Sequence, residues 1–158
     1  MTPVHRIARF KNQAGSVLLE ALVAILIFSV GILAIVGMQT TAVKAASDAK
    51  YRSDASLLAS ELLGQMWVSG GVGAALQANF QGGGGTDGAA YTAWFNNYIL
   101  ANNLLPGVTA AVNQPTVVID PVSGSVTITV KWLLPSEPAG TAAHNYMVMA
   151  QIKCNVCT

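Results

Sequence analysis

Residues 16–38, SVLLEALVAILIFSVGILAIVGM, decide the fold of this chain. Their last 18 residues, 21–38, carry no charge, and one serine and two glycines are all that dilute the apolar run. As an α-helix, these 18 residues span roughly 27 Å, close to the hydrocarbon core of a bilayer at about 30 Å. The stretch therefore predicts a transmembrane helix.

A cleaved secretory signal peptide is the alternative interpretation, because a basic segment precedes the apolar run. The run is too long for an ordinary signal peptide, and no A-x-A cleavage site follows at the expected place. No cysteine stands directly after it, which argues against a lipoprotein. We therefore favour a retained transmembrane helix.

Charge is sparse and unevenly distributed. Hydrophobic residues make up 53% of the 158 residues and charged residues 9%, against about 25% charged residues in soluble domains. Arg6, Arg9 and Lys11 precede the apolar run, so the positive-inside rule predicts a cytoplasmic N-terminus and an outward-facing remainder. That remainder has five basic and seven acidic residues, which argues against nucleic acid as a partner.

Glu20 is the unusual residue of the segment. A carboxylate within an apolar helix costs a few kcal/mol on insertion scales, which makes it a functional candidate. The alternative is that Glu20 lies near the membrane interface and reaches water. That alternative leaves unexplained why an acid follows Gly15 so closely.

Residues 11–15, KNQAG, followed by residues 16–24, SVLLEALVA, resemble the class III signal of type IV pilins. The resemblance implies that a prepilin peptidase cuts after Gly15 on the cytoplasmic face. Ser16 then becomes the new N-terminus and the site of N-methylation, where the family usually has Phe or Met. Glu20 is the acid at the fifth mature position.

Residues 28–39 and 51–59 resemble minor pilins of the PilV kind. The strong resemblance covers roughly residues 11–67, and the rest matches in layout only. It implies an inner-membrane protein with a single span and a periplasmic head, which later enters a pilus fibre or its tip. The implied partners are the major pilin, other minor pilins, prepilin peptidase and the inner-membrane assembly platform.

The resemblance also implies a role for Glu20 in assembly. In a filament the apolar helices bundle, and the Glu20 of an incoming subunit can pair with the N-terminal amine of a neighbour. A buried charge left unpaired costs about 3–5 kcal/mol. This penalty favours the correct axial register.

A single helix is expected over residues 16–67, because no proline interrupts it. Opposite charges four residues apart, such as Lys44–Asp48, Asp48–Arg52 and Lys50–Asp54, predict a solvated face. One apolar stripe predicts the face that packs on a head: Tyr51, Ala55, Leu58, Leu62 and Met66. We divide the chain into a leader (1–15), a membrane or filament-core half-helix (16–40), an amphipathic half-helix (41–67) and a head (68–158).

Residues 68–90 are expected to form a linker, because they include the run Gly82–Gly85 and such glycines disfavour regular structure. No Lys-Ser/Thr follows the run, which argues against a phosphate-binding loop. Residues 91–104 predict a short helix that places Trp94, Tyr98 and Leu105 on one core-facing side.

Strands are expected after this helix. Residues 116–120 are β-branched, residues 121–124 form a turn, and residues 126–132 alternate with a period of two. Residues 146–153 predict a last strand. The expected fold class is α+β, with a long N-terminal helix packed on a small antiparallel sheet of about three or four strands.

No catalytic constellation is visible in the sequence. His5 lies in the leader, and His144 is expected in a loop without a partner nearby in the sequence. The acids Asp87, Asp120 and Glu137 are scattered over loops and turns, and no nucleophile motif is present. We therefore expect no enzymatic activity, metal or cofactor.

Cys154 and Cys157 form a C-x-x-C pair at the C-terminus. Outside the cytoplasm a disulfide between them is the favoured interpretation. Reduced or mixed thiols, and metal or redox chemistry, remain as alternatives.

Three functions are compatible with these features. The leading one is a minor pilin that primes or joins type IV pili, which would connect the protein with twitching motility and adhesion. The alternative is a minor pseudopilin of a type II secretion system, which shares the signal, the acid and the helix. A third is a tip adhesin or DNA-uptake pilin, and the slightly acidic head argues against DNA uptake.

Overall fold

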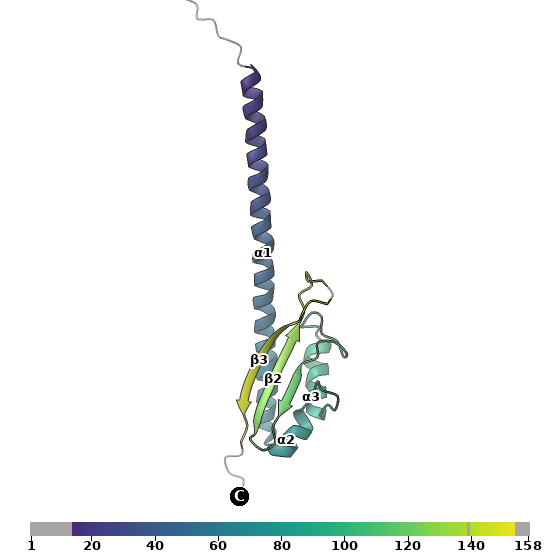
Figure 1. Ribbon diagram of the computed structural model, residues 1–158. Coiled ribbons are helices and arrows are strands. Elements are labelled where there is room, and N and C mark those ends of the chain that lie inside the picture. The colour runs from purple at the N-terminus through teal and green to yellow at the C-terminus, as the bar shows by residue number, and fades with distance from the viewer. Residues whose placement is uncertain (1–13, 139, 154–158) are drawn as a thin grey trace, which may run out of the picture. The chain divides into compact units, whose positions relative to one another are not determined.

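The computed structural model describes residues 14–138 and 140–153. Its first element is a single helix, α1 (Ala14–Ser69), of 56 residues (Figure 1). The predicted helix over residues 16–67 is therefore confirmed and extends by two residues at each end. Gly70 ends it with a φ of 64°, a left-handed conformation that glycine adopts at little cost.

The chain divides into two compact units at the Val43–Lys44 boundary, within α1. In the first unit, every large apolar side chain from Val17 to Val43 is between 45% and 74% exposed. In the described residues, α1 is the one helix that is long and apolar enough to cross a membrane. The expected single span is thus supported by length and composition.

The second unit contains a three-stranded antiparallel sheet in the order β1 (Thr116–Ile119), β2 (Ser125–Trp132) and β3 (His144–Gln151). The register pairs Ile119 with Val126 and Trp132 with His144. The α+β fold class is confirmed. The last strand begins at His144, two residues before the predicted start, because it pairs with β2 along its whole length.

The turn between β1 and β2 is built on Asp120. Its carboxylate accepts hydrogen bonds from the Val122 backbone N–H at 2.9 Å and from the Ser123 hydroxyl at 2.6 Å. These bonds, led by the one from Ser123, lower the pKa of Asp120 below its usual value. Asp120 is therefore a turn-forming residue in this structure.

Two helical predictions were wrong in detail. The expected linker contains a helix, α2 (Gly73–Phe80). Leu76 and Phe80 lie on one face of this helix and are buried in the core, which stabilises the helix. The expected helix over residues 91–104 is instead α3 (Ala89–Trp94) followed directly by a π-helix, η1 (Phe95–Leu100). The wider turns of η1 leave Tyr98 40% exposed, so it is outside the core.

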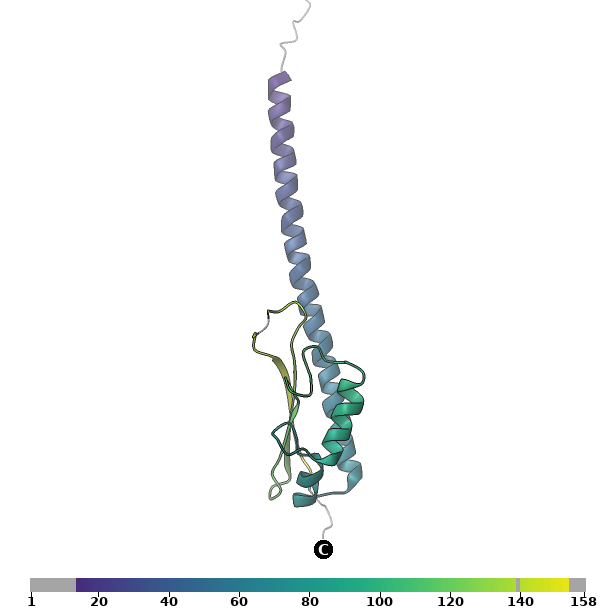
Figure 2. The ribbon, with the colours of Figure 1, turned by 90° about the vertical axis from the view of Figure 1, so that its right-hand side faces the viewer.

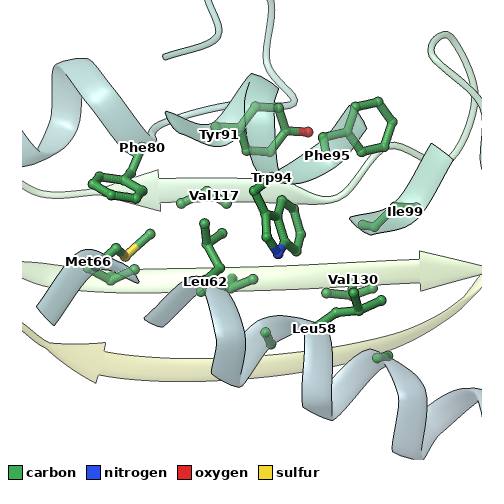
Figure 3. Close-up of a cluster of buried hydrophobic side chains, with 14 of the residues drawn as sticks. Leu58, Leu62, Met66, Phe80, Tyr91, Trp94, Phe95, Ile99, Val117 and Val130 are labelled. Carbon is green, nitrogen blue, oxygen red and sulfur yellow. The ribbon is translucent and has the colours of Figure 1, made fainter. Parts of the chain in front are cut away.

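The core of the second unit lies on one face of the sheet, between the strands and the helices (Figures 2 and 3). Alternate residues of β2 are buried, as their period of two predicts. The predicted stripe of α1 is confirmed, since four of its five residues are buried and Tyr51 packs against the cluster. The buried set is Ala55, Leu58, Ala59, Leu62, Met66, Leu76, Phe80, Tyr91, Trp94, Phe95, Ile99, Leu105, Val108, Val117, Ile119, Val126, Ile128, Val130, Trp132, Leu134 and Ile152.

Candidate functional site

The predicted processing residues lie in the first turns of α1. Gly15, Ser16 and Glu20 are all exposed and helical. Ser16 and Glu20 are one turn apart, about 6 Å along the axis, and therefore share a face of the helix. Within the described residues, the Glu20 carboxylate has neither a hydrogen-bond nor an ion-pair partner.

The hydroxyl groups of the apolar stretch are bonded internally. Ser29 donates to the Ile25 carbonyl at 2.7 Å, and Thr40 donates to the Val36 carbonyl at 3.1 Å. Side chains bonded in this way are compatible with a lipid environment, because their hydroxyl donors are satisfied within the helix. Glu20 is the only ionisable residue of the sequence between Gly15 and Val43, so it carries the one side-chain charge of this stretch.

A second polar site lies in the second unit, at the start of β3. His144 Nδ1 is 3.0 Å from Asp48 Oδ1 of α1, and His144 Nε2 is 2.9 Å from Glu137 Oε1 of the β2–β3 connection. The expectation that His144 lies in a loop was therefore wrong, since His144 is the first residue of β3 and has partners that the sequence alone did not indicate. Asp48 is distant in sequence and Glu137 lies on the far side of a turn, so only the folded chain brings them to His144.

Trp132 completes this cluster, which we call the His144 clip (Asp48, Trp132, Glu137 and His144). Its indole ring stacks on the imidazole with ring centroids 5.8 Å apart, and its Nε1 donates to Asp48 Oδ1 at 3.3 Å. The clip therefore links α1, the end of β2, the connection after it and the start of β3. Lys44 adds a favourable charge near Glu137.

The predicted ion pairs along α1 do not form around Asp48. Within the described part of the chain, the Asp48 carboxylate contacts His144 and Trp132, and neither Lys44 nor Arg52 makes an ion pair with it. A long-range partner replaces the local ones because the β3 side chain approaches this face of α1. The sequence pattern of opposite charges four residues apart was misleading here.

The chemistry of the clip favours a structural role. A neutral imidazole donates from one nitrogen only, whereas the imidazolium donates from both, so the charged form satisfies both carboxylates. The hydrogen bond from His144 is the main cause that lowers the pKa of Glu137. In the described residues no group of three or more His, Cys, Asp and Glu side chains is arranged so that it could hold a metal ion.

The Glu137 contribution to stability should depend on pH. Because folding lowers the pKa of Glu137 below 4.5, the carboxylate stabilises the fold above that pH and loses the effect as pH falls through the folded pKa. Glu137→Gln should therefore lower the melting temperature at roughly pH 6 and have little effect at roughly pH 3. Thermal unfolding of the two proteins across this range measures the difference.

His144→Phe provides the control for this prediction, because phenylalanine keeps a ring against Trp132 and removes both nitrogens. In that background the effect of Glu137→Gln should be smaller at every pH. A wild-type difference that stays constant from acid to neutral pH would show that the His144–Glu137 contact is not the cause.

The Gly-rich run is held by backbone contacts. Gly82 forms a β-bridge with Val117, with hydrogen bonds of 3.2 and 2.9 Å, and the Gly83 N–H donates to Asp87 Oδ1 at 2.8 Å.

Tyr91 is a buried residue with a satisfied hydroxyl group. The Tyr91 hydroxyl donates to the Pro115 carbonyl at 2.7 Å. Burial, with a smaller contribution from Asp87, raises the pKa of Tyr91 well above its usual value, so this phenol stays protonated.

The predicted disulfide pair, Cys154 and Cys157, lies outside the described residues, as does His5 of the predicted leader. Sequence reasoning missed the His144 clip, because Asp48 and Trp132 are 84 positions apart.

Comparison of the chain with protein-family models, with curated proteins and with solved structures finds no match.

Proposed function

We propose that this protein is a minor pilin of the PilV kind, which primes or joins the assembly of type IV pili. The observation that carries the proposal is the placement of Glu20, a lone carboxylate one turn after Ser16 on an exposed apolar helix. The role is structural, and no catalytic step is assigned to any residue.

The exposed apolar surface of the first unit supports the proposal. Side chains such as Leu22, Phe28 and Leu33 are 60–70% exposed, and a helix with such a surface is stable in lipid or in a bundle of similar helices. A pilin uses both environments in turn, first the inner membrane and then the filament core. The proposed topology has a cytoplasmic N-terminus, in keeping with Arg6, Arg9 and Lys11.

Glu20 has a defined task under this proposal. Cleavage after Gly15 leaves an α-amino group on Ser16, and in a bundle this amine and the carboxylates of neighbouring subunits are buried together. Pairing between subunits removes the penalty of an isolated charge, about 3–5 kcal/mol. The proposed partners are the major pilin, other minor pilins, prepilin peptidase and the assembly platform.

Deletion of the gene tests the proposal. We expect sheared surface fibre to collapse while total cellular major pilin stays level, because initiation fails and synthesis does not. A plasmid copy should restore the fibre, and a copy with Glu20→Ala should restore it poorly.

Unchanged surface fibre in the deletion strain would contradict the pilus function. The same signal, acid and helix then favour a minor pseudopilin of a type II secretion system. Loss of secreted proteins from the deletion strain would identify that system.

A further inference from the structure

An open groove of about 400 Å³ lies in the second unit, between α1 and the segment that begins with η1. Its size is in the lower part of the range of ligand pockets, about 300–1,000 Å³. We call it the α1–η1 groove, and its lining residues are Asp54, Leu57, Leu58, Glu61, Tyr98 and Leu104.

The groove exposes three large apolar side chains together. Leu57 is 66% exposed, Tyr98 40% and Leu104 39%. The π-helical turns of η1 bury Phe95 and Ile99 and leave Tyr98 facing outward. π-Helical turns occur frequently at functional sites, and exposed tyrosines rimmed by polar residues are typical of protein interfaces.

Two carboxylates flank the apolar side chains. Asp54 and Glu61 are seven residues apart on α1, about 10.5 Å or two turns along one face. In the part of the chain that the structure describes, neither forms an ion pair, and Glu61 accepts one hydrogen bond, from Gln65 Nε2 at 3.2 Å.

The predicted partner of Asp54 is engaged elsewhere. Lys50 Nζ lies over the ring of Tyr51, 5.1 Å from its centroid, so the predicted Lys50–Asp54 pair is absent among the described residues. The charge of Asp54 is therefore available to a partner outside this chain.

We infer that the α1–η1 groove binds an apolar segment of a partner protein that carries Lys or Arg side chains about two helical turns apart. The lining residues of α1 are spaced i, i+3, i+4 and i+7, so they lie along one face of the helix over about two turns, and a partner segment can contact all four together. Two carboxylates on the rim attract basic side chains and repel anionic lipid headgroups and nucleic acid. The inference rests on the proposed function only in taking the partner to be a neighbouring filament subunit.

Photocrosslinking in the cells that make the protein tests this inference. Tyr98 is replaced in the full-length chain by p-benzoylphenylalanine, which has a similar shape, and adducts are sequenced by mass spectrometry. Val122, which is 94% exposed and lies outside the groove, is the control position. We expect an adduct at position 98 and not at 122, with a peptide whose aliphatic residues are flanked by Lys or Arg.

Charge variants distinguish specific recognition of basic side chains from nonspecific hydrophobic contact at this surface. Asp54→Asn with Glu61→Gln removes both charges, and Asp54→Glu with Glu61→Asp keeps them. The neutral pair should reduce the adduct about fivefold, as expected for two partly exposed ion pairs, and the charged pair should leave it nearly unchanged.

The inference is overturned if position 98 gives no more adduct than position 122 while the protein accumulates in the membrane at its normal level. It is also overturned if the adduct is with lipid, or if the neutral pair leaves its yield unchanged. The deletion experiment tests the pilus function independently of this inference. Unchanged surface fibre together with a charge-dependent adduct would reject the pilus function and still support partner binding in the α1–η1 groove.

Discussion

Gly83→Ala should destabilise the second unit by about 2–4 kcal/mol, which combines the cost of a left-handed residue with that of overpacking. Gly83 has a φ of 75°, a conformation that favours glycine. A Cβ at this position would also overlap the Pro115 carbonyl and lie 3.0 Å from the Thr116 Cα. Both obstacles are backbone atoms, so a side-chain rotation cannot relieve them.

Thermal unfolding of the full chain in detergent, followed by tryptophan fluorescence, measures this effect. Trp94 and Trp132 are buried in the core of the second unit, so their emission reports on its unfolding. For a domain of this size, we expect the melting temperature to fall by roughly 10–20 °C.

Gly84→Ala is the matched control in the same run of glycines. A Cβ at Gly84 meets no atom within 4 Å, and its φ lies outside the left-handed range. Its effect should stay within about 0.5 kcal/mol. Equal losses in the two variants would show that the run responds to any added side chain, and that the contact of Gly83 with Pro115 is not the cause.

Gly15→Val should abolish processing by a co-expressed prepilin peptidase, from nearly complete to undetectable. Beyond the backbone of its own helical turns, a Cβ at Gly15 meets no atom of the described residues within 4 Å, so the described part of the fold tolerates the change. The obstacle lies in the active site of another protein, which under the proposed function must accept the backbone at this residue closely. Intact mass, with or without residues 1–15, measures the outcome.

Gly31→Val provides the matched control, because Gly31 also lies in α1 with open space around its Cα. The change in side chain is the same, and processing should be complete. Retention of residues 1–15 in the unsubstituted protein would remove the basis of the pilin proposal. Cleavage of Gly15→Val would instead move the predicted processing site.

Local patterns determined α1 and the strands of this fold. The uncharged run of residues 21–38 and the stripe from Tyr51 to Met66 predicted α1, because helix periodicity is a property of neighbouring residues. The alternation in β2 predicted which of its residues are buried, because successive side chains of a strand point to opposite faces. The predictions for Gly15, Ser16 and Glu20 come from the sequence resemblance and await the processing experiment.

The tertiary structure decided the polar contacts and the surfaces. His144 is positioned by Asp48 and Glu137, Gly83 is constrained by Pro115, and Tyr98 is turned outward by η1. The first two depend on side chains or backbone from segments that the sequence separates, and the third depends on a π-helix where the sequence pattern predicted an α-helix, so neither composition nor period could reveal them. The sequence by itself determined the long apolar helix and the strands. The His144 clip, the contact of Gly83 with Pro115 and the α1–η1 groove required the packing of these elements, because long-range contacts exist only once the chain has folded.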